Sequence, residues 1–128
     1  WQPPSQKPTT CHGDLTLENL VVDPRGELWM LDLLDAPYEH YWQDIAKLHQ
    51  DLAGGWYLRR QPPIARCVAD YLSRRILEHA ERLNPQYPGV HHLLVACTFV
   101  RILPYAAAPA VREFLRERIT YFAAQIPG

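Results

Sequence analysis

The sequence lacks a charge bias, a cysteine pattern and a long hydrophobic run. Its 128 residues carry 13 Lys and Arg against 14 Asp and Glu, which disfavours nucleic acid as a partner. The three cysteines are widely spaced and form no CxxC pair, which argues against a disulfide framework and a zinc site. No apolar run is long enough to span a bilayer, and the start carries no signal-peptide pattern. We therefore expect a cytoplasmic protein with no membrane partner.

The first ten residues, WQPPSQKPTT, contain three prolines and no initiating Met. Proline removes N–H donors and restricts its neighbours. We expect residues 1–10 to be an irregular linker or incoming segment, and residues 11–128 to be one domain of a longer parent protein.

A β-hairpin is predicted shortly after this segment. Two short apolar runs, 20–22 and 28–31, flank Asp23-Pro24-Arg25-Gly26. Asp, Pro and Gly at the first, second and fourth positions suit a type I turn, and Gly26 can adopt the left-handed conformation that closes such a hairpin.

Apolar residues at helical spacing predict four helices after the hairpin, at about 41–53, 64–83, 89–105 and 108–125. The apolar face expected for the second helix consists of Ile64, Val68, Leu72, Leu77 and Ala80. We expect Cys97 to lie in the core. The predicted fold is mainly α with a small β-hairpin (α+β). A site over residues 11–35 is backed by helices over residues 41–128.

Three polar side chains lie near the two ends of the predicted hairpin. Asp14 and Asn19 precede it, and Asp32 follows it. Gly13 permits a bend beside Asp14, whose carboxylate could accept a proton from a substrate hydroxyl. Asn19 and Asp32 offer the hard oxygen ligands that Mg²⁺ takes while it keeps positions for phosphate oxygens. A base and two such ligands are the minimum set for phosphoryl transfer.

The stretch HGDLTLEN resembles the catalytic loop of the aminoglycoside phosphotransferase and choline kinase group, relatives of the protein kinases. The resemblance implies that residues 11–128 form a protein kinase-like C-terminal lobe. Asp14 would then be the catalytic base, and Asn19 and Asp32 would bind Mg²⁺. The implied reaction transfers a phosphoryl group from ATP to a hydroxyl of a small molecule.

The same resemblance extends to the first predicted helix. Asp44, in Asp44-Ile45-Ala46, is similar to an Asp that caps this helix in the family and braces the catalytic loop. His12 could be a metal ligand or a base, but a histidine in such a place is more often structural, and we expect its ring to bond backbone carbonyls near the loop. Gly13 is expected to support the site as well.

The resemblance covers about residues 11–53 and leaves two features open. Asp32-Leu33-Leu34-Asp35 replaces the aromatic- or Gly-containing sequence that often follows the magnesium Asp, so Asp35 is either a second carboxylate at the metal or an exposed loop acid. The Gly-rich loop and the strand Lys of the family's N-terminal lobe are missing. We therefore expect the isolated chain to be inactive and the missing N-terminal lobe of the parent to be its partner.

Two rival interpretations remain beside the kinase. One is a non-catalytic kinase-like module that binds or regulates a partner, and the other is a metal-dependent hydrolase that uses Asp14, Asp32 and Asp35 around one cation. Competent side chains at the base and ligand positions favour the kinase. Glu39 and His40 follow the site closely and are candidates for contact with the substrate.

Overall fold

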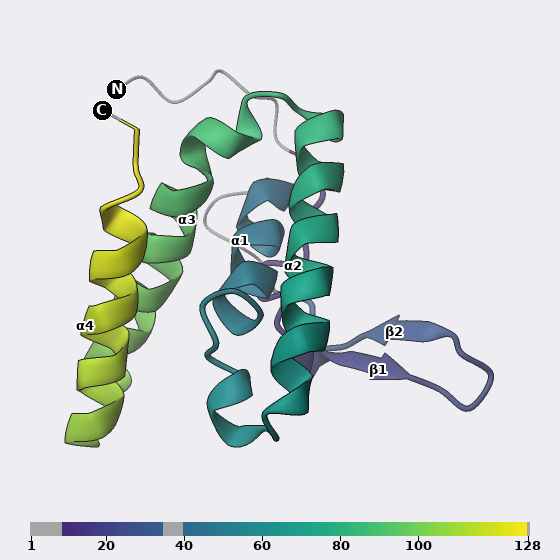
Figure 1. Ribbon diagram of the computed structural model, residues 1–128. Helices are drawn as coiled ribbons and strands as arrows, with labels where there is room; N and C mark the ends of the chain where they lie inside the picture. Colours follow the sequence, from purple (N-terminus) through teal and green to yellow (C-terminus); the bar gives the residue numbers. More distant parts are fainter. Residues whose placement is uncertain (1–8, 35–39, 128) are drawn as a thin grey trace.

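The computed structural model describes residues 9–34 and 40–127, in which four helices form a body and one hairpin extends from its side (Figure 1). The helices are α1 (Tyr41–Asp51), α2 (Ile64–Leu83), α3 (Tyr87–Ile102) and α4 (Pro109–Ala123), and the strands are β1 (Leu20–Val22) and β2 (Leu28–Met30). Short 3₁₀ turns lie at Leu17–Asn19, Leu58–Arg60 and Leu103–Tyr105. The predicted α+β fold, mainly helical with a small hairpin, is confirmed.

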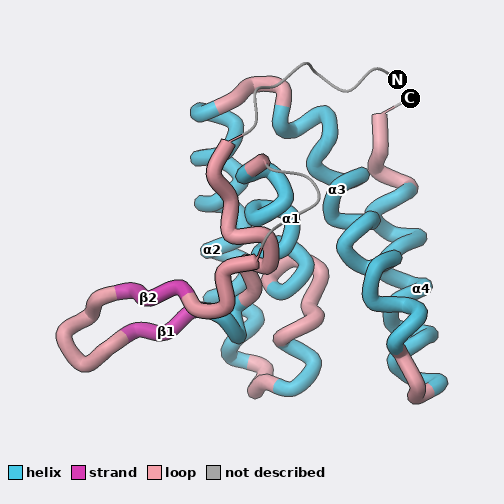
Figure 2. Tube along the Cα trace, turned by 180° about the vertical axis from the view of Figure 1, so that it is seen from behind, coloured by secondary structure: helices cyan, strands magenta, loops and turns pink. Residues whose placement is uncertain are grey.

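The hairpin forms where the turn chemistry predicts it. Strands β1 and β2 pair antiparallel, with Val21 opposite Trp29. The Gly26 N–H donates to the Asp23 carbonyl oxygen at 2.9 Å, and Gly26 is left-handed with φ +84°. The Asp23 carboxylate also accepts the N–H groups of Arg25 and Glu27, each at 2.9 Å. Figure 2 shows both strands pointing away from the helices.

Helix α3 is the centre of the helical body because it packs against α1 and α4 and also contacts α2. One buried cluster joins α1, α3 and α4 around Phe99, Leu115 and Phe122. A second joins α1, α2 and α3 around Trp42 and Tyr87. Helix α1, the first helix after the hairpin in the sequence, takes part in both clusters and is therefore covered on two sides.

The segment after α1 makes a close approach to α3 at Gly54. A Cβ atom at this position would lie 2.5 Å from Cζ of Phe99 and 2.6 Å from the carbonyl oxygen of Gln50. Real Cβ atoms do not come so near, so only glycine lets the chain pass the Phe99 ring here. This contact sets how closely the end of α1 lies against α3.

The predicted burial of α2 is wrong for its first half, from Ile64 to Leu72, and holds for Ala80 near its end. Ile64 and Val68 are 73% and 58% exposed, whereas the small residues Ala69, Ser73 and Ala80 are buried. Small side chains allow α2 to lie close to its neighbours, and this turns its larger apolar side chains outward. Cys97 on α3 is also exposed, because the described elements leave that face of α3 uncovered.

The helix bounds differ from the expectations by a few residues. Helix α3 begins at Tyr87 rather than about 89, and it tightens into a 3₁₀ turn at Leu103, next to Pro104, which has no N–H to donate. None of the described helices is both long and apolar enough to cross a membrane.

Candidate functional site

Residues 11–19, which we call the His-Gly-Asp loop, are fastened to α1 through the carboxylate of Asp44. The N–H of His12 donates to Oδ2 of Asp44 at 2.6 Å, and the N–H of Gly13 donates to Oδ1 at 2.9 Å. Gly13 is left-handed with φ +84°, a conformation that glycine adopts without steric cost. The Gln43 side chain also donates to the Gly13 carbonyl oxygen at 3.2 Å.

The expectation that Asp44 caps α1 is wrong. The helix begins at Tyr41, and its N-cap is His40, whose Nδ1 accepts the N–H of Trp42 at 3.3 Å. Asp44 lies within the first turn of the helix, so its carboxylate reaches the loop and not the helix end.

His40 does not face a substrate space, because it is 2% exposed and its ring stacks on that of Tyr41. Burial lowers the pKa of His40, which favours the neutral ring that can accept the capping hydrogen bond. Asp35 and Glu39 lie outside the described residues.

The carboxylate of Asp14 forms an ion pair with a lysine of α1. Nζ of Lys47 lies 2.7 Å from Oδ1 of Asp14, and the side chains of Lys47 and Asp14 are 9% and 31% exposed. Lys47 is not among the site residues predicted from the sequence. The available signal was its position three residues after Asp44, because such residues share one face of a helix.

Asp51 extends this polar face of α1 by a further turn. Its Oδ2 accepts the N–H of Leu17 at 2.7 Å. Burial raises the pKa of Asp51, while the Leu17 N–H and the charge of Lys47 oppose the shift. Asp44, Lys47 and Asp51 thus contact three successive parts of the loop.

Asn19 joins the loop to the hairpin. Its Nδ2 donates to the carbonyl oxygen of Asp14 at 2.9 Å, which leaves Oδ1 as the side-chain atom available to a cation. Its own carbonyl oxygen accepts the N–H of Leu31 at 2.9 Å. Asp32 directly follows Leu31 in the sequence, so Asn19 and Asp32 lie at the same end of the hairpin.

Asp32 is exposed and has an unusual backbone conformation. Its φ is +57°, the one left-handed value among the described residues other than glycine. This conformation turns the chain back toward the loop, where the N–H of Leu34 donates to the His12 carbonyl oxygen at 3.0 Å. The two ends of the site are therefore connected through the backbone.

The His12 ring does not bond backbone carbonyls as expected. His12 is 5% exposed, and within residues 9–34 and 40–127 neither of its ring nitrogens has a hydrogen-bond partner. Its backbone groups make the connections instead, one to Asp44 and one to Leu34.

The described residues contain no group of three or more His, Cys, Asp or Glu side chains placed to hold a metal ion. Asp35, which the hydrolase interpretation uses together with Asp14 and Asp32, lies outside the described residues. Asn19 and Asp32 together provide a smaller set of one amide oxygen and one carboxylate.

The chain matches the family model described as the phosphotransferase enzyme family over residues 1–92. It belongs to this family. The part of the chain that matches the phosphotransferase family includes the His-Gly-Asp loop, the hairpin, α1 and α2, and ends within α3. No curated protein and no solved structure gave a significant match.

Proposed function

We propose that this member of the phosphotransferase family is part of a small-molecule kinase. In the proposed reaction, an acceptor hydroxyl oxygen forms a bond to the γ-phosphorus of ATP, and the bond to the bridging oxygen of ADP breaks. The hydroxyl proton passes to the carboxylate of Asp14. Family membership supports phosphotransferase chemistry, and the half-exposed Asp14 carboxylate supports its role as the base.

Lys47 is proposed to position this base. Its ion pair with Oδ1 of Asp14 fixes the carboxylate from the side of α1, which leaves Oδ2 to receive the proton. Orientation of a catalytic group before the reaction removes an entropic cost from the transition state.

Asn19 and Asp32 fit a magnesium ion bound together with the nucleotide. Asn19 donates through Nδ2 to Asp14, so its oxygen remains for the cation, and Asp32 adds an exposed carboxylate. Mg²⁺ is commonly held by one or two protein oxygens together with water and phosphate oxygens. When bound, it would neutralise charge on the phosphates.

One observation carries the proposal, namely the hydrogen bond from the Leu31 N–H to the Asn19 carbonyl oxygen. It closes the hairpin one pair beyond its strands and brings the residue before Asp32 alongside Asn19. Asp14 is connected to the same Asn19 through its own carbonyl oxygen. The backbone of Asp14 and that of the residue before Asp32 are thus both hydrogen-bonded to Asn19, which supports a shared site for the three side chains.

The proposal is tested by phosphotransfer in the full-length protein that contains this chain. Asp14→Asn and Asp32→Ala should each lower the rate by about a hundredfold or more, and Asp70→Asn, an exposed change on α2, should leave it unchanged. Near-normal activity in both site variants would refute the proposal. Release of inorganic phosphate alone would instead indicate a hydrolase, and no turnover by the folded protein would indicate a binding module.

The role of Lys47 has its own readout. Lys47→Met should lower kcat by roughly tenfold or more with little change in the KM for ATP, because it loosens the base and not the nucleotide. Lys47→Arg should restore part of the loss. Equal losses in both variants, or a change in KM alone, would contradict a positioning role.

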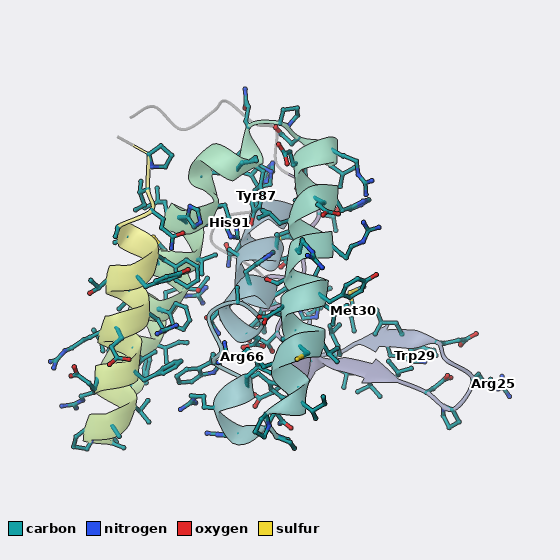
Figure 3. The ribbon with its side chains drawn as sticks, viewed as in Figure 1. Arg25, Trp29, Met30, Arg66, Tyr87 and His91 are labelled. Atoms are coloured by element: carbon teal, nitrogen blue, oxygen red, sulfur yellow. The ribbon has the colours of Figure 1, made fainter. Side chains whose placement is uncertain are left out.

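The hairpin suggests where the rest of the nucleotide site lies. Its side chains are mostly apolar and exposed, including Leu28 at 62% and Met30 at 64%. Figure 3 shows Trp29 out along the hairpin and Met30 at the end of β2 that lies next to α2. Exposed apolar side chains in a group indicate a surface that another element covers, and we propose the N-terminal lobe of the parent.

The isolated chain of 128 residues should therefore bind Mg·ATP weakly, since one wall of the nucleotide site would be missing. Calorimetric titration of the chain with Mg·ATP checks this expectation. Tight binding would show that the described elements suffice to hold the nucleotide.

A further inference from the structure

A hollow of about 460 Å³ adjoins the His-Gly-Asp loop. On one side it is lined by Leu17 and Glu18 of the loop, and on the other by Trp56, Arg59 and Arg60 from the segment between α1 and α2. This segment runs along the bottom of Figure 1, at the foot of α2. None of the proposed base and metal-binding residues lines the hollow, so it is a neighbouring space and not the reaction centre itself.

Arg59 is held in the wall of the hollow by contacts with Trp56. Its guanidinium carbon lies 3.6 Å from the centre of the Trp56 ring, and its Nε donates to the Trp56 carbonyl oxygen at 2.8 Å. The stacking uses the face of the guanidinium, and the hydrogen bond uses one of its five N–H groups. The terminal N–H groups remain, in the planar arrangement that binds a carboxylate or a phosphate through two oxygens.

The positive charge of the hollow has little compensation. Glu18 is its one acidic lining residue, set against Arg59 and Arg60, and in the described part of the chain neither arginine forms an ion pair. Burial, followed by the charge of Arg60, lowers the pKa of Arg59. A bound anion would offset both effects.

The hollow is close enough to the proposed base for one small molecule to reach both. Glu18 follows Asp14 by four residues, so their Cα atoms are at most about 14 Å apart. The 3₁₀ turn at Leu17–Asn19 shortens this path further. The N–H of Leu17 is bonded to Asp51, so α1 holds the lining of the hollow on the same helix face that holds Asp14.

We propose that this hollow binds the phosphoryl acceptor, and that the acceptor is a hydroxylated small molecule carrying a carboxylate or phosphate group, which Arg59 and Arg60 bind. This inference rests on the proposed kinase function. It goes beyond that function because it names the chemical class of the acceptor and the residues that select it.

The experiment uses three matched series of probes in the full-length protein. They are ω-hydroxycarboxylates of increasing chain length, the corresponding ω-hydroxyalkyl phosphates, and the uncharged ω-hydroxyamides. Binding is measured by calorimetry without ATP, and phosphotransfer is measured separately with Mg·ATP. The carboxylates or the phosphates should bind better than the amides, and phosphotransfer should be best at one chain length. Comparison of the two anionic series identifies which anion the site prefers.

The variants separate the anion site from the reaction. Arg59→Met should weaken binding of the anionic probes by roughly tenfold to a hundredfold, since it removes charge-assisted hydrogen bonds. Arg60→Gln, at an exposed position, should weaken it without affecting folding. Arg116→Gln, an exposed change on α4, should have no effect, and Asp14→Asn should abolish phosphotransfer while it preserves binding.

Three results would overturn the inference. Equal binding of anionic and uncharged probes, or no response to Arg59→Met and Arg60→Gln, would refute the anion site even if phosphotransfer persisted. Anion binding that depends on both arginines, with phosphotransfer insensitive to Asp14→Asn, would instead refute the proposed reaction and with it the acceptor role.

Discussion

The His-Gly-Asp loop and the hairpin are continuous in sequence but are held in the fold by different means. The loop is fastened to α1 by Asp44, Lys47 and Asp51, all of which are buried. The hairpin is held by its own backbone pairs and its turn, and most of its side chains are exposed. The loop is therefore part of the helical body, whereas the hairpin is an extension of it.

This difference divides the proposed site at Asn19. Asp14 and Asn19 lie on the fastened side, and Asp32 lies on the hairpin side, where its backbone is left-handed. Backbone hydrogen bonds from Leu31 to Asn19 and from Leu34 to His12 join the two sides before and after Asp32. Mutations on both sides of Asn19, together with a change of pH, test this division.

Asp44→Ala should have the largest effect, because it removes the acceptor of two buried loop N–H groups. A hydrogen bond to a charged group contributes about 1.5–3 kcal/mol, so the free energy of unfolding should fall by about 3 kcal/mol or more. Urea unfolding measures the loss, with Asp70→Ala on the exposed side of α2 as the matched control. Equal stabilities of the two variants would mean that Asp44 does not hold the loop.

The helical body should lose stability in mild acid. His91 is 4% exposed, and burial, followed by the charges of His49 and His92, lowers its pKa from 6.5 to about 3. The unfolded chain binds the proton first, so stability is full above about pH 6.5 and falls as the pH decreases toward about 3. Between about pH 7.5 and about pH 5 the expected loss is about 2 kcal/mol.

Urea unfolding at a series of pH values checks this expectation. Figure 3 shows His91 and Tyr87 together on α3, with Nδ1 of His91 lying 3.0 Å from the Tyr87 hydroxyl. His91→Gln should reduce the pH dependence and leave the part due to His49, whose pKa burial also lowers. His79→Gln, at an exposed position on α2, should preserve it. An unchanged slope in His91→Gln would assign the pH dependence to other groups.

Asp32→Gly should separate stability from activity on the hairpin side. A left-handed residue with a side chain costs roughly 1 kcal/mol, so the free energy of unfolding should be unchanged or rise by up to about that amount. Phosphotransfer should nevertheless be lost with the carboxylate. Asp32→Ala keeps the Cβ atom and should be less stable than Asp32→Gly; equal stability would mean that the backbone at this position is not strained.

Met30→Ala should have the smallest effect, below about 0.5 kcal/mol, because its side chain is 64% exposed. Leu115→Ala is the buried counterpart on α4 and should cost about 2–5 kcal/mol. Urea unfolding compares the two. A loss of similar size for Met30→Ala would show that the hairpin belongs to the cooperative core, contrary to the division drawn above.

The hairpin and the four helices could be predicted because their signals are local. Asp23, Pro24 and Gly26 specify a turn within four residues, and apolar spacing identifies each helix. Which face of a helix is covered depends on other elements. Ile64 and Val68 repeat as a buried face should, yet Ala69 and Ser73 make the contact because small side chains let α2 lie close.

The same limit applies to the candidate site, where local spacing could be read from the sequence and contacts between distant residues could not. Asp14, Asn19 and Asp32 were identified from their spacing around a predicted hairpin, and their proposed roles await the kinetic tests. Lys47 was not identified, because a lysine within a helix is common in any sequence, and the Arg59-Arg60 pair by itself indicates no more than a solvated face that a phosphate or an acidic partner could use. Their roles depend on tertiary contacts, because Lys47 pairs with Asp14 only when the loop lies against α1, and the Arg59 guanidinium is oriented by stacking on Trp56.

A substitution at Gly54 would disturb the site indirectly, by displacing the helix that holds it. The helix that bears Asp44, Lys47 and Asp51 ends just before it, and the Phe99 ring occupies the space that a side chain at this position would need. Even a methyl group would push the end of α1 away from α3, and the loop would move with the helix. A genetic screen for loss of function should therefore recover substitutions at position 54, although that residue contacts none of the proposed reacting groups.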